Sequence, residues 1–153
     1  MSSLLLTIYN REDDPAYQAW YDTGQLKSEI YYLNYEFHRE DGPAVQYWYE
    51  NGKLESKHYY LNGKWYREDG PAIQSWYDTG KLKSEEYYLN NNLHKEDGTA
   101  YRSWYENGKL KSEYYYLNDE KYNQEQFVKK LKEMNSPHYE EQLMILQANK
   151  YNL

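Results

Sequence analysis

Cysteine is absent from this chain of 153 residues. Its absence excludes disulfide bonds, zinc sites built on thiolates and catalysis by a thiol. Long apolar runs are also missing, and none approaches the roughly 18 residues that a membrane-spanning helix needs. The short cluster at Leu4, Leu5 and Leu6 lacks the basic start and the cleavage pattern of a signal peptide. We therefore expect a soluble, cytoplasmic protein.

Phenylalanine is scarce too, because the chain has 2 Phe beside 22 Tyr and 5 Trp. The mean hydropathy is -1.24, which makes a conventional aliphatic core improbable. A disordered chain, however, would be poor in aromatic residues. The composition instead predicts a thin structure whose apolar surface is mostly Tyr and Trp, with their hydroxyl and indole N–H groups kept near water.

Positive charge is in deficit, since 18 Lys and Arg face 25 Asp and Glu for a net charge of -7. Residues 123–153 hold equal numbers of Lys and Glu, so the whole excess belongs to residues 1–122. An acidic surface repels phosphate groups and anionic lipid headgroups. We therefore expect neither nucleic acid nor a membrane as a partner.

What the chain does have is a repeat. The motif Arg-Glu-Asp at 11–13 returns at 39–41 and 67–69, and as Lys-Glu-Asp at 95–97, always 28 residues apart. Each copy holds an Ala, a Trp-Tyr pair, a Gly, a Leu, a Ser and a Tyr-Tyr-Leu-Asn block at fixed positions. The predicted copies are 11–38, 39–66, 67–94 and 95–122. Residues 1–10 align with the back half of a further copy and predict a starter strand.

The first half of each copy predicts a hairpin around a three-residue loop such as Glu50-Asn51-Gly52. Glycine supplies the positive φ that such a short loop requires. This loop sets Trp48 opposite Leu54 and, with strict alternation along both strands, Gln46 opposite Ser56.

The second half predicts another hairpin, closed by the two-residue turn Asn62-Gly63, and it sets Tyr60 opposite Trp65. The equivalent pairs are Tyr32 with Phe37 and Tyr88 with Leu93. Asn91 and Asp119, which replace the glycine in later copies, tolerate the left-handed conformation. Tyr35 in the first copy does not, so we expect that turn to be distorted or of another type.

Alternation along the strand places Leu54, Ser56, His58 and Tyr60 on one face together with Trp48 and Trp65. The fold class that follows is an all-β repeat: an elongated single-sheet antiparallel β-meander of tandem hairpins. Its repeated aromatic residues form the candidate interaction surface. These residues are Trp20, Tyr32, Trp48, Tyr60, Trp65, Trp76, Tyr88 and Trp104.

Residues 123–153 predict a short C-terminal α-helical cap. Phe127, Val128, Leu131 and Met134 stand at helical spacing. Ser136-Pro137 is typical of an N-cap followed by proline at the first helical position, where a second helix would begin. Two such helices would cover the open edge of the last hairpin. The alternative is a helix that dimerises or binds a partner.

The copies resemble MORN-like repeats, most closely those of YwqK-type antitoxin proteins and of repeat-rich proteins of giant DNA viruses. Three segments carry the resemblance: Trp-Tyr-Glu-Asn-Gly-Lys-Leu at 48–54, Tyr-Tyr-Leu-Asn-Gly-Lys at 59–64 and Arg-Glu-Asp-Gly-Pro-Ala at 67–72. It covers about 112 of the 153 residues and leaves out the tail. The resemblance implies an extended sheet used for contacts, with no catalytic residues to transfer.

Catalytic and metal-binding patterns are weak. His38 and His94 share one repeat position, which Tyr fills in the other copies, and this favours a ring in a surface slot over a metal ligand. The Glu-Asp pairs lack the alternating oxygen ligands of a calcium loop. Neighbouring strand residues also point to opposite faces, which makes each pair a poor acid–base couple. We expect no enzyme activity, no metal and no cofactor.

The function that this sequence favours is a non-catalytic scaffold for protein–protein interaction, because exposed Tyr and Trp are typical of binding surfaces. The partner is then an unknown protein, a second copy in a homodimer, or both. Two alternatives stay open. One is a carbohydrate- or ligand-binding aromatic surface; the other, implied by the resemblance alone, is an antitoxin-like neutraliser of a partner protein.

Overall fold

The computed structural model describes residues 14–151, so the predicted starter strand at 1–10 lies outside the described residues. One nine-stranded antiparallel sheet has the order β1-β2-β5-β6-β9-β10-β13-β14-β15. Its strands are β1 (Tyr17–Trp20), β2 (Leu26–Ile30), β5 (Val45–Trp48), β6 (Leu54–His58), β9 (Ile73–Trp76), β10 (Leu82–Glu86), β13 (Tyr101–Trp104), β14 (Leu110–Leu117) and β15 (Glu120–Tyr122).

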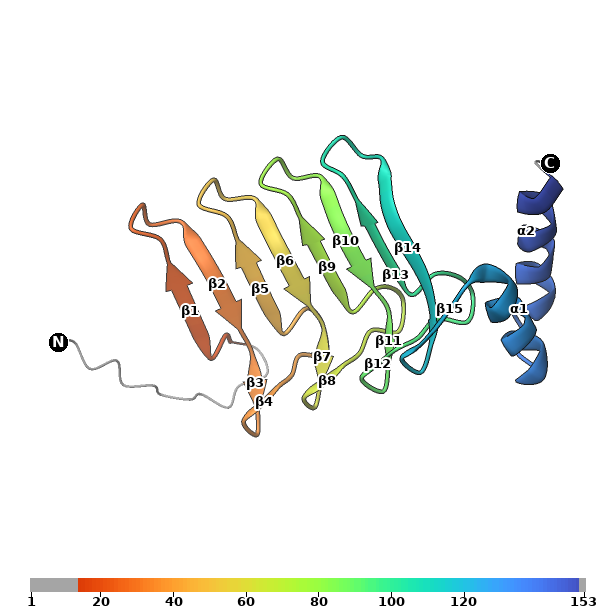
Figure 1. Ribbon diagram of the computed structural model, residues 1–153. Coiled ribbons are helices and arrows are strands. Elements are labelled where there is room, and N and C mark those ends of the chain that lie inside the picture. Colours follow the sequence, from red (N-terminus) through yellow and green to blue (C-terminus); the bar gives the residue numbers. More distant parts are fainter. Residues whose placement is uncertain (1–13, 152–153) are drawn as a thin grey trace.

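Three small two-stranded hairpins lie along one end of this sheet (Figure 1). They are β3 (Tyr32–Leu33) with β4 (Glu36–Phe37), β7 (Tyr60–Leu61) with β8 (Lys64–Trp65), and β11 (Tyr88–Leu89) with β12 (Asn92–Leu93). The helices α1 (Gln124–Glu133) and α2 (Tyr139–Tyr151) follow at the C-terminal end of the array. The predicted all-β meander of tandem hairpins with a helical cap is confirmed.

The three-residue loop of the first hairpin is as predicted. The Tyr49 N–H donates to the Lys53 carbonyl at 2.9 Å, and the Gly52 N–H donates back to the Tyr49 carbonyl at 2.9 Å. Gly52 has a φ of 81°, a left-handed conformation that glycine adopts at little cost. Trp48 pairs with Leu54, which confirms that part of the predicted register.

One step further along the hairpin the predicted register is wrong. A β-bulge between Tyr47 and Trp48 shifts the pairing, so Gln46 lies opposite Lys57 and not Ser56. A bulge places two residues of one strand against one of the other. Strict alternation therefore fails here, and Trp48 falls on the face of Gln46 and Lys57. The same shift occurs in the first hairpin of each of the other three copies.

The turns of the second hairpins share one geometry, contrary to the expectation for Tyr35. Asn34 and Tyr35 have φ values of 51° and 66°, and Asn62 and Gly63 have 49° and 71°. Both central residues are thus left-handed in each turn, as the twist of a tight hairpin demands. Tyr35 adopts this conformation with its side chain 81% exposed, and the next copy fixes the strand after the turn, because the Gly63 N–H donates to the Phe37 carbonyl at 2.9 Å.

Replacing Tyr35 by Gly should therefore stabilise the protein by about 1 kcal/mol, because glycine removes the cost of a left-handed non-glycine residue and little packing is lost. Urea unfolding would measure the change. Tyr35→Phe keeps the strain and should leave the unfolding midpoint where it is. Equal midpoints for Tyr35→Gly and the wild type would contradict this account.

Successive copies are joined by a repeated tyrosine hydrogen bond. The hydroxyl groups of Tyr21, Tyr49 and Tyr77 donate to the carbonyl groups of Trp48, Trp76 and Trp104 at 2.8–2.9 Å. Each bond runs from the first turn of one copy to the next copy. The alanines that follow the opening motifs, Ala44, Ala72 and Ala100, are fully buried between neighbours. Each unit is thus held mainly by its neighbours, as in other repeat arrays.

The largest fully buried side chains, Phe127 and Leu131, belong to helix α1 and not to the sheet. Phe127, Val128 and Leu131 of α1 pack with Leu117 of β14. Asn123 caps α1, and Gln126 returns the bond in a capping box. The ring of Phe127 packs on that of Tyr115 at an angle of 38°, with centroids 4.6 Å apart. The cap is therefore a small hydrophobic core of its own, attached to the last copy.

The second helix begins at Tyr139, two residues beyond Pro137. The Ser136 Oγ accepts from the His138 N–H at 3.2 Å, so this serine caps a turn that leads into the helix. Gln142 joins α2 to the loop before β13, because its Nε2 donates to the Asp97 carbonyl at 3.1 Å. Within residues 14–151, neither helix is long and apolar enough to cross a membrane.

Candidate interaction surface

The structure divides the eight predicted surface residues into two groups. Four of them join Phe37 in one continuous aromatic row along the small hairpins. The row runs Tyr32, Phe37, Tyr60, Trp65, Tyr88, with successive ring centroids 4.8, 5.0, 5.6 and 4.8 Å apart. Such spacing is favourable for aromatic pairs. The row therefore holds the copies together as well as forming a surface.

Burial raises the pKa of the Tyr32 and Tyr60 hydroxyls. The pKa of Tyr88 is raised as well, first by burial and then by the nearby carboxylate of Glu86, to which its hydroxyl donates at 3.0 Å. These hydroxyls therefore resist ionisation to a higher pH than an ordinary tyrosine does.

The other four residues, Trp20, Trp48, Trp76 and Trp104, form a tryptophan row nearer the turns of the first hairpins. Each of them pairs across the bulge with a leucine of its own copy. Trp20 in the first copy is 55% exposed, whereas the other three are half-buried. The sequence predicted one ladder on one face; the bulge separates these tryptophans from the row that contains Tyr60 and Trp65.

A third row, which the sequence did not predict, crosses the sheet beside the tryptophans. One residue from each of eight strands contributes, in direct cross-strand register. This charged row is Gln18, Glu29, Gln46, Lys57, Gln74, Glu85, Arg102 and Glu113. Only the observed register reveals it, since the predicted pairing had placed Gln46 opposite Ser56.

Opposite groups face each other along the charged row. Gln18 Nε2 donates to Glu29 Oε1 at 2.8 Å. Arg102 lies between two carboxylates, 3.8 Å from Glu85 and 3.9 Å from Glu113. Lys57 Nζ lies 5.4 Å from the centre of the Trp76 ring, which shows that the charged row and the tryptophan row share a face. Pairs of this kind stabilise a sheet by about 0.2–1 kcal/mol each.

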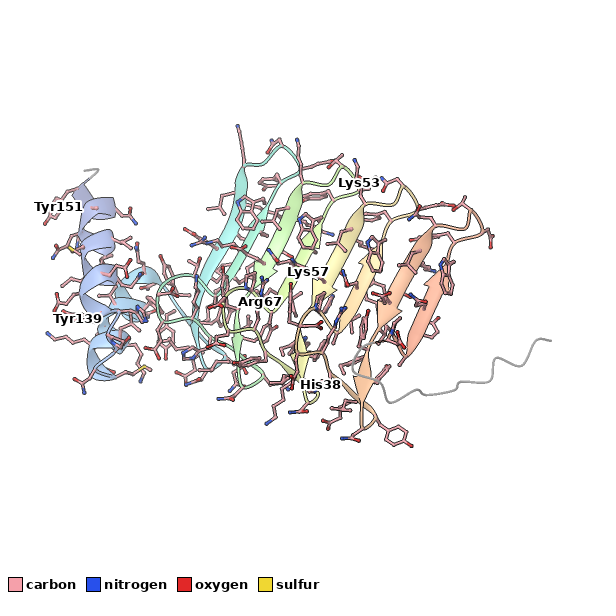
Figure 2. The ribbon with its side chains drawn as sticks, turned by 180° about the vertical axis from the view of Figure 1, so that it is seen from behind. His38, Lys53, Lys57, Arg67, Tyr139 and Tyr151 are labelled. Carbon is pink, nitrogen blue, oxygen red and sulfur yellow. The ribbon has the colours of Figure 1, made fainter. Side chains whose placement is uncertain are left out.

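Cations also cover tyrosine rings at each junction between copies. Arg39 lies 4.0 Å from the centre of the Tyr31 ring, Arg67 lies 4.3 Å from that of Tyr59, and Lys95 continues the pattern over Tyr87 at 3.9 Å. Figure 2 shows Lys57 over the middle of the sheet, with Arg67 nearer the small hairpins and His38 at that end. These contacts join the motif that opens each copy to the copy before it.

Between the opening motifs of neighbouring copies the surface is hollowed. One hollow of about 600 Å³ lies between residues 39–43 and 66–69. A second, of about 650 Å³, lies between residues 66–70 and 94–97 and reaches His138. Both are open and carry cations and carboxylates side by side. They suit a polar protein surface better than an apolar small molecule, which needs an enclosed site.

The histidines make structural hydrogen bonds. His38 Nδ1 accepts from the Asn62 N–H at 3.1 Å, and His94 Nδ1 accepts from the Asn118 N–H at 3.2 Å. Each ring thus ties a copy to the second turn of the next one. Among residues 14–151, no three His, Asp or Glu side chains come together as a metal site would require.

His58 differs from these two. It lies between Val45 and Ile73 on the neighbouring strands, and burial lowers the pKa of its imidazole. The unfolded chain therefore binds the proton more readily than the folded one. The stability of the fold is complete above the ordinary histidine pKa of about 6.5 and falls as the pH drops below it.

Ile30 occupies the position of His58 in the first copy, so His58→Ile is a substitution that the repeat already accepts. We expect it to reduce the loss of stability between about pH 7.5 and pH 5.5, because one group that resists protonation is removed. Urea midpoints at the two pH values would measure this. Parallel losses in the variant and the wild type would show that His58 is not responsible.

The chain belongs to the MORN repeat family. The model of a MORN repeat variant matches it four times, at residues 16–34, 44–62, 73–95 and 99–118, which together make up more than half of the chain. Comparison with curated proteins and with solved structures found no match. The MORN repeat family is not known as an enzyme family. Its repeats are generally associated with interactions with proteins and membranes.

Proposed function

We propose that this protein is a non-catalytic scaffold that binds another protein through the face formed by the tryptophan row and the charged row. The single-layered sheet carries this proposal. No second layer covers it within the described residues (Figure 1), and the face presents large rings beside charged groups. Such a mixture of aromatic anchors and a polar surround is typical of protein interfaces.

The chemistry of the face favours a protein over a lipid surface. Carboxylates outnumber cations in the chain, and Glu29, Glu85 and Glu113 stand in the charged row itself. An anionic bilayer would be repelled by them. A protein surface can instead place a cation or an amide opposite each carboxylate.

Trp20 offers a direct test, because its ring is exposed and can be removed at little cost to the fold. Tagged wild-type protein, Trp20→Ala and the control Tyr35→Ala would be used to capture proteins from the source cells. We expect the wild type and Tyr35→Ala to capture the same proteins in similar amounts. Trp20→Ala should capture at least tenfold less of them, because an aromatic anchor contributes about 1.4 kcal/mol or more to binding.

Light scattering after size exclusion would show whether the same face is used for self-association. A dimer that Trp20→Ala dissociates would make a second copy the partner. A monomer that captures nothing above background would overturn the scaffold proposal.

The resemblance to YwqK-type antitoxin proteins supports a narrower form of the same function, in which the bound protein is a toxin. Co-expression with a candidate toxin from a neighbouring gene would test it. Rescue of growth by the wild type and its loss with Trp20→Ala would favour this form.

A further inference from the structure

The C-terminal edge of the sheet is covered along only half of its length. β14 runs from Leu110 to Leu117, but β15 pairs only with residues 115–117. Within the described residues, no strand pairs with the outer side of residues 110–114, and Figure 1 shows that half of β14 with β13 on its inner side and no strand on its outer side. Leu110 is 48% exposed. An open edge of this kind offers a row of backbone N–H and C=O groups to another strand.

The helices explain why only half of the edge is closed. Phe127 of α1 covers the ring of Tyr115, the position at which Arg39 and Arg67 cover tyrosines in earlier copies. Gln142 and Ser136 attach the cap to Asp97 and Glu96. The cap therefore takes the place that the opening motif of a fifth copy would need, so a whole second molecule does not fit there in the register of the array.

The array itself shows what chemistry suits the open half. At each inner junction the second strand of one copy pairs with the first strand of the next. The central pairs are Glu29 with Gln46, Lys57 with Gln74 and Glu85 with Arg102. Glu113 holds the same position at the open edge. The carboxylates at this position face an amide or a guanidinium, so a strand added at β14 would place Gln or Arg opposite Glu113.

The turn before β14 offers a second set of matching groups. Residues 105–110 repeat residues 49–54 letter for letter. In the inner copy, Tyr49, Asn51 and Lys53 donate side-chain hydrogen bonds to the carbonyl groups of Trp76, Asp78 and Thr79 at 2.8, 2.8 and 3.0 Å. Tyr105, Asn107 and Lys109 carry the same donors. Tyr105 is 51% exposed, and its hydroxyl has no acceptor among the described residues.

We propose that residues 105–114 bind an extended segment of a protein partner, which adds to β14 as an antiparallel strand. The segment carries Gln or Arg opposite Glu113, and two residues later an aromatic residue whose carbonyl accepts from the Tyr105 hydroxyl. This proposal rests on the proposed scaffold function and defines one way in which a partner docks. Backbone hydrogen bonds supply affinity in such a complex, and the side chains facing Glu113 and Tyr105 supply specificity.

The probe is a labelled peptide with the sequence of residues 71–80, which contains β9 and its turn, titrated with the full chain by fluorescence anisotropy. Two further peptides carry Arg or Glu in place of Gln74. The wild-type chain should bind the Arg peptide most tightly and the Glu peptide least, with steps on the order of fivefold, as expected for an exposed charge pair. Glu113→Lys should reverse that order.

Tyr105→Phe should weaken all three peptides about fivefold, the effect of losing one hydrogen bond of about 1 kcal/mol. Tyr66→Phe, at another half-exposed tyrosine, is the matched control and should change nothing. No saturable binding, or an order of peptides that Glu113→Lys leaves intact, would overturn the edge proposal. In that case, proteins captured through Trp20 would still support the scaffold. If the three peptides bind in the expected order but the chain captures no protein from cells, only the scaffold proposal is contradicted.

Discussion

The variant Phe127→Ala is expected to lose about 3–5 kcal/mol of the stability of the helical cap, the usual cost of deleting a fully enclosed aromatic ring. Phe127 is 0% exposed, and its ring contacts both the cap core and Tyr115 of the last copy. Since α1 holds α2 through this cluster, the loss should release both helices together.

Two spectroscopic signals separate the cap from the sheet. All five Trp lie between residues 20 and 104, so Trp fluorescence reports on the sheet, whereas far-UV circular dichroism at the helical minimum reports on residues 124–151. In urea, Phe127→Ala should lose the helical signal well before the fluorescence change. Met144→Ala, at a 63% exposed position of α2, is the control and should follow the wild type. Unchanged urea midpoints for Phe127→Ala in both signals would show that the hydrophobic cluster contributes little to the stability of the cap.

The second large effect is expected from Ala72→Leu, which should destabilise the fold by about 3 kcal/mol. Ala72 is 0% exposed, and its carbonyl accepts from the Tyr59 N–H at 2.8 Å, so the backbone at the junction cannot retreat from a larger side chain. Overpacking of this kind forces neighbouring side chains out of their preferred rotamers.

The first copy provides the matched control. Ala16 holds the same position in that copy as Ala72 in the third, but its side chain is only half-buried. Ala16→Leu should therefore cost much less than Ala72→Leu in the same urea experiment. Equal losses at the two positions would mean that the junction between copies does not confine the methyl group.

The repeat, its turns and the paired residues nearest the turns could be predicted because each depends on local chemistry. Gly52 requires a loop with positive φ, and Asn62-Gly63 closes a tight hairpin that sets Tyr60 opposite Trp65. Tyr35 was the exception. Its local preference opposes the turn it adopts, and the strand after that turn is held from outside the local sequence, because the Phe37 carbonyl accepts from the Gly63 N–H of the next copy.

The candidate surface was harder to predict, because a single extra residue changes which side chains share a face. The bulge beside Trp48 is invisible in a pattern of alternating residues, yet it moves Gln46 opposite Lys57. The charged row follows from that register, whereas the open half of β14 follows from the short pairing of β15 with residues 115–117. The contacts of Arg39 with Tyr31 also join different copies, so no window within one copy contains them.

The tyrosine hydrogen bonds have a consequence for how such a chain changes length over generations. Their acceptors are backbone carbonyl groups, which every residue carries, so the bond from Tyr49 to Trp76 makes no demand on the side chain that receives it. A unit duplicated or lost by unequal recombination would leave each new neighbour with the same acceptor. The array can thus be lengthened or shortened one unit at a time, and the helices at its end can close whichever unit comes last.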